Sequence, residues 1–490
     1  MFIYFHVKLY FMIPVLVNMG LVLQLAGILI AFPIAMAFVY NETQAIISLF
    51  LTSFAFFFVG FFLNTLSVRR ELDFRQSCIL LTTVFFILGI LGAIPYFWLN
   101  AFNDSSILSR FMNSLFESVS GYTTTGFSLI TDPDALPRSL MFYRSFTHLV
   151  GGLGVVFLLL AFFYTGSTLE NMSKVMNFVR VTDSIKRSLV MILAVYTVYI
   201  LLFSTIFYLL GFTKIADSIS VVISSLMTGG FSPATDFSPY SAFPTGLLVI
   251  VMMIFGATSF FIHYRIISRK SGNVLTKEFW MFLLVSASGV LALMIVYPID
   301  FFTTVFHVIS ASTGTGFSSM PFSDIPEKGK LVFIFLMFFG GMSFSTAGGI
   351  KILRVALFLK SVPMVIGNSL GKGTEKIEFD GIYYDRNEIV TNLVIILLSI
   401  VLVVATTVLI SFSGFSLIDS MFEAVSAFGT TGLSVGIATT ALAMHLKLML
   451  IFLMVIGRVE ILPFLVALSK LGTYHLPDHH EVLVKTGLKF

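Results

Sequence analysis

Long apolar stretches separated by short polar segments run through this chain of 490 residues. About ten of them are long enough to cross a bilayer, since a spanning helix needs roughly 20 apolar residues. They cover approximately residues 9–39, 44–66, 78–99, 141–164, 186–212, 243–267, 276–299, 330–360, 388–413 and 443–469. Several of these stretches exceed the usual length, so we expect tilts, kinks or interruptions in them.

Shorter amphipathic stretches, such as residues 111–120 and 420–427, lie between spans and are too short to cross a bilayer. Each is followed by a glycine-containing strip, and four such strips align without gaps. They are strip 1 (residues 122–128, YTTTGFS), strip 2 (226–232, LMTGGFS), strip 3 (312–318, STGTGFS) and strip 4 (428–434, FGTTGLS). Their shared glycines recur about every hundred residues, which indicates an internal repeat. These glycines are Gly126, Gly230, Gly316 and Gly432.

The repeated unit is a span, a short helix, a glycine strip and a second span. A unit with two crossings starts and ends on the same side, so the four units are parallel repeats around an axis normal to the membrane. We therefore predict an all-α integral membrane protein with four pseudo-fourfold repeats of span, pore helix, filter and span. Two extra transmembrane helices occupy residues 1–70, and the repeats cover 71–170, 171–271, 272–386 (with an interrupted inner helix) and 387–490 (with a cytoplasmic tail).

Composition supports a membrane protein and excludes several other classes. Hydrophobic residues make up 57% of the chain and charged residues 11%, whereas soluble domains carry about 25% charged residues. The single Cys78 excludes an internal disulfide and a Cys/His metal motif. The net charge of +4 is too small to indicate a nucleic-acid partner. We expect the apolar N-terminus to be a retained helix rather than a signal peptide.

The distribution of Lys and Arg predicts the orientation, because cytoplasmic loops carry an excess of both. The junctions between units hold Arg69, Arg70, Arg75, Lys174, Arg180, Lys186, Arg187, Arg265, Arg269, Lys270, Lys277, Lys360, Lys372, Lys376 and Arg386. The loops beside the strips hold only Arg110, Arg138, Lys214, Lys328 and Lys330, mixed with Asp132, Asp134, Asp300 and Asp324. The junctions are therefore predicted to be cytoplasmic, and the strips face the outside.

The strips have the chemistry of a selectivity filter. Irregular backbone at membrane depth is tolerated where it lines a watery cavity, and converging carbonyl oxygens can replace the water shell of a cation. Glycine permits the backbone angles that this requires, and the short helices direct their negative C-terminal ends toward the ion. A carbonyl ring suits a weakly hydrated monovalent cation, whereas calcium calls for carboxylates. The expected ion-binding residues are Thr124, Thr125, Gly126, Thr228, Gly229, Gly230, Gly314, Thr315, Gly316, Thr430, Thr431 and Gly432.

Five segments together carry a family resemblance. They are residues 116–126 (FESVSGYTTTG), 148–154 (HLVGGLG), 259–264 (SFFIHY), 340–354 (GGMSFSTAGGIKILR) and 457–460 (GRVE). On these motifs the sequence resembles the TrkH/KtrB/HKT superfamily of potassium transport proteins, and the two leading spans favour the TrkH branch. In strip 2, Met227 departs from the serine that the family more often carries, and we do not count it as a filter residue.

The resemblance implies potassium uptake across a prokaryotic plasma membrane, with K⁺ as the transported ion. It also implies a homodimer in membrane lipid and a cytosolic nucleotide-binding regulatory subunit of the TrkA type, docking on the basic inner loops. Plant members that prefer sodium carry serine at the place of Gly126, so this glycine favours potassium. We find no catalytic dyad, nucleotide site or organic cofactor motif in the chain, and we expect no enzymatic activity.

A gate is expected within residues 330–360. The four glycines of this span, with serine and threonine between them, predict a break in the helix, although close helix packing would also use small residues. The resemblance implies an intramembrane loop beneath the filter. Arg458 lies between two apolar runs, where a charge is costly, and is either an electrostatic barrier below the filter or part of a buried ion pair. The expected gate residues are Gly340, Gly341, Gly348, Gly349, Lys351 and Arg458.

Some residues have two open readings. Glu117 and Glu423 each lie nine residues before a strip glycine, and either attract cations or form hydrogen bonds to the pore loops. Lys351 and Arg354 share a helix face and would also serve as anchors at the cytoplasmic end. For the whole protein, the alternatives are a sodium-permeable or cation-coupled symporter on the same scaffold, and a membrane enzyme or assembly scaffold without transport.

Overall fold

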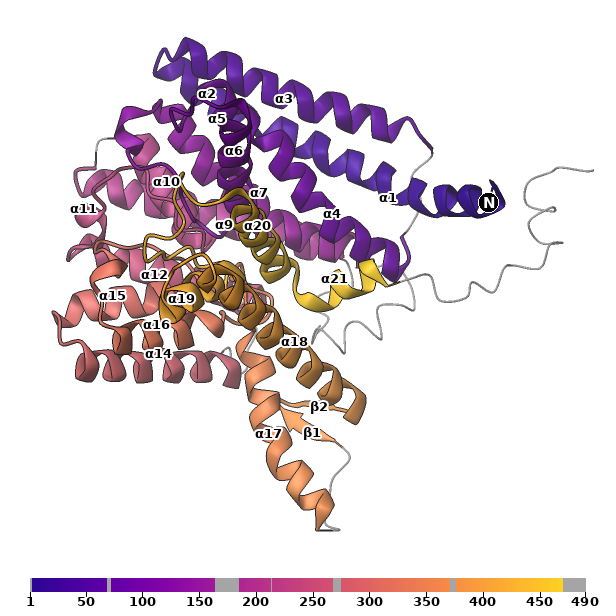
Figure 1. Ribbon diagram of the computed structural model, residues 1–490, viewed down its shortest axis with the longest axis vertical. Helices are drawn as coiled ribbons and strands as arrows, with labels where there is room; N and C mark the ends of the chain where they lie inside the picture. The colour runs from indigo at the N-terminus through magenta and orange to yellow at the C-terminus, as the bar shows by residue number, and fades with distance from the viewer. Residues whose placement is uncertain are drawn as a thin grey trace, which may run out of the picture.

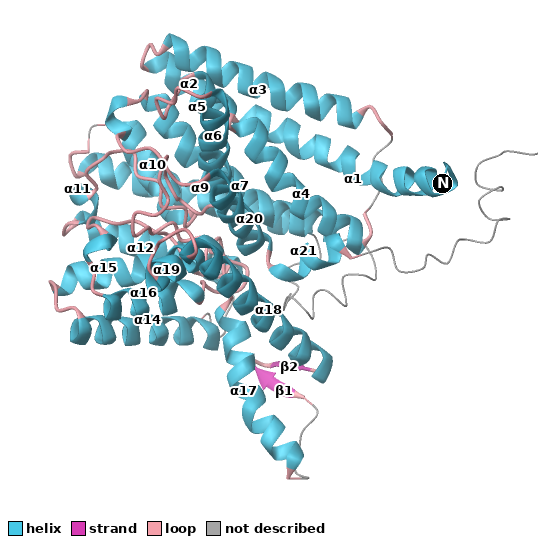
Figure 2. Cartoon of the chain, viewed as in Figure 1, coloured by secondary structure: helices cyan, strands magenta, loops and turns pink. Residues whose placement is uncertain are grey.

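The computed structural model of the chain describes residues 2–67, 72–163, 185–212, 214–267, 275–370 and 376–469 (Figure 1). This part is mostly helical, with one two-stranded hairpin (Figure 2). Several residues singled out in the sequence lie outside it, namely Arg69, Arg70, Lys174, Arg180, Arg269, Lys270 and Lys372.

The order of elements follows the predicted repeat. The leading helices are α1 (Phe2–Leu29), α2 (Ala31–Val39) and α3 (Thr43–Asn64). The first two units contain α4 (Phe74–Gly92), α5 (Ile94–Trp98), α6 (Ile107–Tyr122) and α7 (Arg138–Phe163), then α9 (Ile185–Leu209), α10 (Ile215–Leu226), α11 (Ser238–Ser241), α12 (Thr245–Ala257) and α13 (Phe260–Ile267). The last two contain α14 (Lys277–Val296), α15 (Phe301–Ser312), α16 (Glu327–Phe338) and α17 (Ile352–Ser369), then α18 (Arg386–Ser411), α19 (Leu417–Phe428), α20 (Met444–Val459) and α21 (Ile461–Leu468). Between them, β1 (Ile377–Phe379) and β2 (Ile382–Tyr384) form an antiparallel hairpin that projects from the bundle with α17.

Six of the described helices are long and apolar enough to cross a membrane, and two bent helix pairs raise the number to eight. Their outer faces are apolar as well. On α3, for example, Phe58 and Phe61 are more than half exposed. Exposure of such side chains to water would be unfavourable, whereas contact with lipid is favourable. The chain is therefore an integral membrane protein, as its hydropathy predicts.

Three of the predicted inner spans are interrupted. Helices α12 and α13 meet at 106°, and α20 and α21 meet at 108°. The second bend is at Glu460, whose φ of +67° cannot continue a right-handed helix. The third inner span ends at Phe338 and resumes at Ile352, so the predicted break in residues 330–360 is present. Residues 243–267 and 443–469 were each predicted as one span, with kinks or interruptions expected in the longer spans; each is a sharply bent pair.

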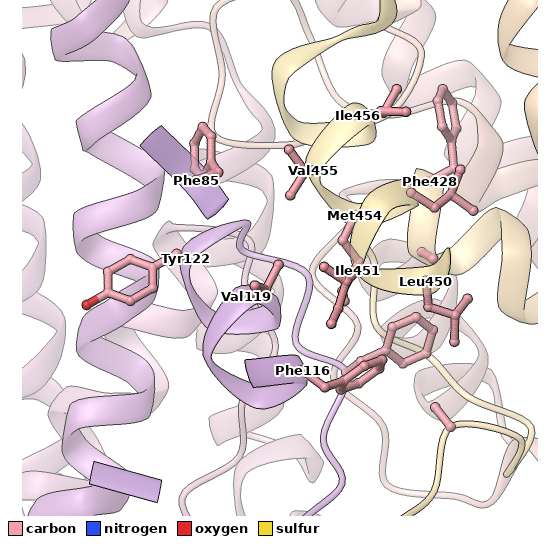
Figure 3. Packing of buried hydrophobic residues seen from close by; sticks show 14 of the residues in the cluster. Phe85, Phe116, Val119, Tyr122, Phe428, Leu450, Ile451, Met454, Val455 and Ile456 are labelled. Carbon is pink, nitrogen blue, oxygen red and sulfur yellow. The ribbon is translucent and has the colours of Figure 1, made fainter. Parts of the chain in front are cut away.

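The core brings helices of the first unit against the inner helix of the fourth unit (Figure 3). Helix α6 packs between α4 and α20, where Phe116 and Val119 meet Leu450 and Ile451. Within this layer Gly89 of α4 faces Val119 so closely that a Cβ would lie 2.4 Å from its side chain. The pore helix of the first unit therefore lies against the inner helix of the last, which closes the four units into a circle.

Candidate ion-conducting site

The four strips share one backbone conformation. Each shared glycine has φ between +76° and +81°. The residue two positions earlier is also left-handed, with φ of +53° at Thr124, +50° at Thr228, +70° at Gly314 and +48° at Thr430. Threonine rarely adopts such angles, so its presence in three strips marks a conformation enforced by the surroundings. Alternating handedness turns successive carbonyl groups toward one side, which a ring of ion-binding oxygens requires.

Contacts between the strips show that they form a closed ring. A Cβ added to each shared glycine would collide with a carbonyl oxygen of the next strip. The collisions are Gly126 with Gly229 at 2.0 Å, Gly230 with Thr315 at 2.0 Å, Gly316 with Thr431 at 1.6 Å and Gly432 with Thr125 at 2.2 Å. Strip 1 therefore contacts strip 2, and the sequence of contacts continues through strips 3 and 4 back to strip 1. We call this arrangement the glycine ring.

The pore helices hold the ring in the same way in all four units. The backbone N–H just before each shared glycine donates to a serine carbonyl in the last turn of its helix, over 2.7–2.9 Å. The pairs are Thr125 with Ser120, Gly229 with Ser224, Thr315 with Ser310 and Thr431 with Ser426. The threonines of the strips are fully buried, whereas each shared glycine is partly accessible. The helices thus direct their negative C-terminal ends toward the ring.

The side chains behind the ring do not share the fourfold pattern of the backbone, because only strips 1 and 3 have the same pair of hydroxyl groups. In strips 1 and 3, paired threonine hydroxyls lie 2.8 Å apart, Thr123 with Thr125 and Thr313 with Thr315. Strip 2 lacks such a pair. There the sulfur of Met227 packs against Gly152 of α7, and the ring of His148 fills the space beside Gly229.

Residues 339–351, which we call the inner loop, lie against the ring. Thr346 Oγ1 is 3.2 Å from Thr228 Oγ1 of strip 2. On the other side, a Cβ at Gly348 would lie 2.1 Å from Thr430 Oγ1 of strip 4. Strips 2 and 4 are not neighbours in the ring, so they face each other across its axis. The inner loop therefore extends from strip 2 to strip 4 beside the buried threonines of the ring.

Arg458 connects the inner loop to the first unit. Its guanidinium donates to the carbonyl oxygens of Thr346, in the inner loop, and of Gly151 and Gly152, in α7. Its Nε has no hydrogen-bond partner among the described residues. Glu460, two residues further along the chain, does not pair with it and instead forms an ion pair with Arg354. The second cation of the loop region, Lys351, donates to a carbonyl within the inner loop, that of Ala347.

Glu278 is a functional candidate that sequence reasoning missed. It lies in the first turn of α14, and its Oε1 accepts the backbone N–H of Ser343 at 2.7 Å and of Leu353 at 3.2 Å. These residues belong to the loop and to the start of the helix that follows it. One carboxylate thus holds both the inner loop and the start of α17. An acidic residue at the beginning of a long apolar run was the available signal.

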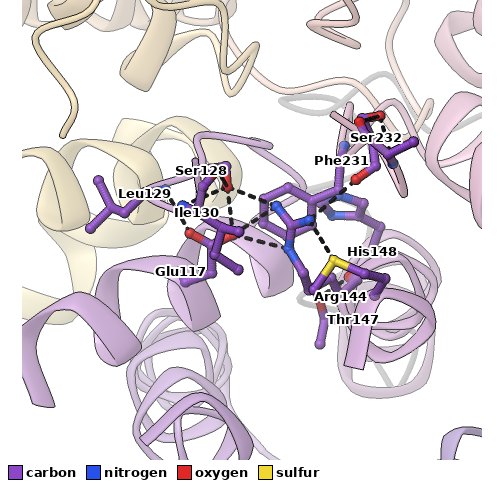
Figure 4. Close-up of polar contacts among 11 residues, drawn as sticks. Glu117, Ser128, Leu129, Ile130, Arg144, Thr147, His148, Phe231 and Ser232 are labelled. Atoms are coloured by element: carbon purple, nitrogen blue, oxygen red, sulfur yellow. Dashed lines mark hydrogen bonds and ion pairs between the residues drawn. The ribbon is translucent and has the colours of Figure 1, made fainter. Parts of the chain in front are cut away.

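In the first, third and fourth units, the residue nine positions before the shared glycine holds the chain beyond the strip. Glu117 accepts the Ser128 hydroxyl and the Leu129 N–H at 2.9 and 2.8 Å (Figure 4). Glu423 accepts the Ser434 hydroxyl and the Ile437 N–H. In the third unit, His307 Nε2 is 3.2 Å from the N–H of Ser319. Of the two readings of these acidic residues, the structure shows hydrogen bonding to the pore loops.

Apolar spanning helices around a ring of inward-turned peptide groups define a membrane transport protein. More specifically, the chain belongs to the TrkH family, whose family model, described as a cation transport protein, matches residues 43–475. An uncharacterized cation transporter from Methanocaldococcus jannaschii is 28% identical over 459 residues, which are 92% of this chain and 94% of the relative.

Two further comparisons agree. The Trk system potassium uptake protein TrkG of Escherichia coli is 25% identical over 472 residues, covering 89% of this chain and 93% of that protein. The crystal structure of the potassium transporter TrkH from Vibrio parahaemolyticus matches with a TM-score of 0.81 at 22% identity, covering 93% of this chain and 98% of that one. This last likeness confirms the predicted fold class.

Proposed function

We propose that this protein mediates potassium uptake across a prokaryotic plasma membrane, through the glycine ring acting as a selectivity filter. The observation that carries the proposal is the closure of four left-handed glycine strips into one ring. Relatives bearing the name Trk system potassium uptake protein support potassium as the ion. The proposed ion-binding residues are those named from the sequence, three consecutive positions in each strip.

Backbone oxygen provides the chemistry of selection. The strips contain no carboxylate, and the nearby Glu117 and Glu423 already accept hydrogen bonds from the chain behind the ring. A dehydrating ion would therefore exchange water for neutral carbonyl dipoles, which suits a weakly hydrated monovalent cation such as K⁺ better than a divalent one.

The inner loop is the proposed gate. Its position across the ring axis blocks passage, and its glycines Gly340, Gly341, Gly348 and Gly349 leave little side-chain bulk to move. Arg458 and Lys351 place positive charge beside the path. Opening would require the Arg458 guanidinium to release the carbonyl of Thr346, which lets the loop leave the axis.

The expected partners follow from the family. We propose a homodimer in membrane lipid with the ring mouth facing outward, and a cytosolic nucleotide-binding regulator of the TrkA type on the basic inner face. The projecting hairpin supports a mechanical route to the gate. Lys277 bonds to Asp380 and pairs with Glu378 of the hairpin, and it precedes Glu278, which holds the inner loop.

Ion flux in proteoliposomes containing the purified full-length chain tests this function. With K⁺ inside and Na⁺ outside, we expect a membrane potential set by the K⁺ gradient, with flux increased by the cytosolic regulator. An equal response to Na⁺ would favour the sodium-permeable alternative. Saturable flux that follows an imposed proton gradient would favour a coupled symporter, and no flux of any cation would refute the proposal.

A further inference from the structure

One arginine lies behind the contact between strips 1 and 2 and bonds to both (Figure 4). Arg144 of α7 donates from Nη2 to the Ser128 hydroxyl of strip 1 at 2.8 Å. From Nη1 it donates to the carbonyl of Ser232, the last residue of strip 2, at 3.2 Å. Its guanidinium also lies over the ring of Phe231, 4.2 Å from the centroid. A single side chain therefore connects two neighbouring strips of the glycine ring.

The charge of Arg144 is balanced by Glu117 of the pore helix α6. The Nη2–Oε1 distance is 2.8 Å, and Nε also donates to Oε1 at 3.0 Å. The side chains are 2% and 0% exposed, so neither charge has access to water. Removing one member of such a pair leaves the other as an uncompensated buried charge. The pair is thus fixed in position, and its hydrogen bonds hold both strips in place.

The second unit lacks the side chain that holds the strip in the other three units. Nine residues before its glycine it has Val221, whose side chain cannot accept a hydrogen bond. The corresponding side chains of the other units hold the chain beyond their own strips. Strip 2 is held instead from the first unit. Arg144 bonds to Ser232, and His148 Nε2 is 3.4 Å from the N–H of Phe231.

The corresponding places in other inner helices are apolar. Arg144 lies seven residues before Gly151, a glycine whose Cβ would collide with the last carbonyl of the pore helix. Gly256 and Gly457 have the same contact in the second and fourth units. Seven residues before them are Val249 and Leu450, both fully buried. The inner helices of the second and fourth units therefore have no charged side chain at this place.

The same two units are also connected at the outer surface. Thr235, beyond strip 2, donates its N–H to Asp134 at 3.0 Å and its hydroxyl to Asp132 at 3.1 Å. The backbone N–H of Thr235 lowers the pKa of the Asp134 carboxyl. These contacts are exposed to solvent and screened by salt, so the buried pair provides the stiffer connection.

We propose that Glu117 and Arg144 form a specificity-determining support, which holds strip 2 in the glycine ring and so sets the preference for K⁺ over Na⁺. This inference rests on the proposed function. A carbonyl ring distinguishes ions by the number and placement of its oxygens, and a strip released on one side can move inward to meet a smaller ion. The planar fork of arginine reaches its several acceptors at once, which the point charge of lysine does not.

The test is the permeability ratio of K⁺ to Na⁺ in proteoliposomes of the full-length protein. This ratio does not depend on the amount of folded protein, so a stability defect alone leaves it unchanged. We expect the ratio to fall about tenfold in Arg144→Gln and in Glu117→Gln, the factor expected from one charge-assisted hydrogen bond. Because the two residues act as one unit, the double variant should fall no further than either single variant.

Lys330→Gln is the matched control. It removes a different, partly buried ion pair, with Asp419 at 2.7 Å, that involves no strip residue, and it should keep the unmodified ratio. If Arg144→Gln does not fold, Phe231→Leu removes the aromatic ring beneath the guanidinium and should lower the ratio less. Unchanged ratios in every conducting variant would overturn the inference. An unmodified protein that shows no preference for K⁺ over Na⁺ would instead refute the proposed function.

Discussion

At the scale of single residues, the ring uses glycine for two different reasons. Gly316 has φ of +81°, and its Cβ would lie 1.6 Å from a carbonyl oxygen of strip 4. Gly314, in the same strip, is also left-handed, but its Cβ would meet nothing closer than 3.4 Å. The other three strips carry threonine at this earlier position. Glycines such as Gly316 are required because the next strip comes so close. At the position of Gly314 the left-handed conformation alone does not exclude a side chain.

Arg458→Ala tests the gate at this scale. The variant removes the hydrogen bonds from the guanidinium to the inner loop and to α7, so the loop should leave the axis more often. We expect basal K⁺ flux without the regulator to rise about tenfold, the effect of losing one hydrogen bond from a charged group. Lys447→Ala, which removes another buried cation of α20 that bonds to Asn113, should leave basal flux unchanged. A folded Arg458→Ala protein with unchanged basal flux would argue against the gate.

The sequence predicted the shared glycines and Arg458, because repetition and a charge in an apolar run are visible without a structure. It did not predict that Thr124 and Thr228 are left-handed, since threonine has no local preference for that conformation. It also missed Arg144. Its importance depends on contacts with Glu117 and strip 2, which are far away along the chain.

At the scale of elements, the inner helices are interrupted close to the ring. The breaks at residues 258–259, 339–351 and 460 each follow or contain a glycine that lies against a pore helix or strip. The sequence predicted the break that contains four glycines. It did not give the positions of the other two, because Thr258 and Ser259 do not exclude helix and the bend at Glu460 comes from its positive φ. Apolar length alone counts a bent pair as one span.

Glu278→Gln tests how the interrupted span is held. The amide oxygen can still accept the N–H groups of Ser343 and Leu353, but without the charge that strengthens these bonds. We expect higher basal K⁺ flux with an unchanged K⁺/Na⁺ ratio, because the loop moves while the ring stays intact. Asp73→Asn alters a comparable acidic residue at the start of α4 and should leave flux as it is. A lower ratio with unchanged basal flux in Glu278→Gln would contradict this role.

At the scale of the whole molecule, a ring with fourfold geometry is supported in three different ways. Strip 1 is held by Glu117, strip 2 by Arg144 from the preceding unit, strip 3 by His307 and strip 4 by Glu423. Among the described residues, only the third unit contributes such an inner loop. In the proposed function, the ring and its supports serve selection, while the inner loop serves gating.

The central claim is that the glycine ring selects the ion, and a pair of substitutions within strip 3 tests it most directly. Gly316→Ala and Gly314→Ala both place alanine at a left-handed position, but only the first pushes a methyl group into the neighbouring carbonyl. Overpacking of this kind costs about 1–3 kcal/mol, so the K⁺/Na⁺ permeability ratio of Gly316→Ala should fall about tenfold or more. Gly314→Ala should keep the ratio of the unmodified protein. Equal ratios in the two variants would contradict the account.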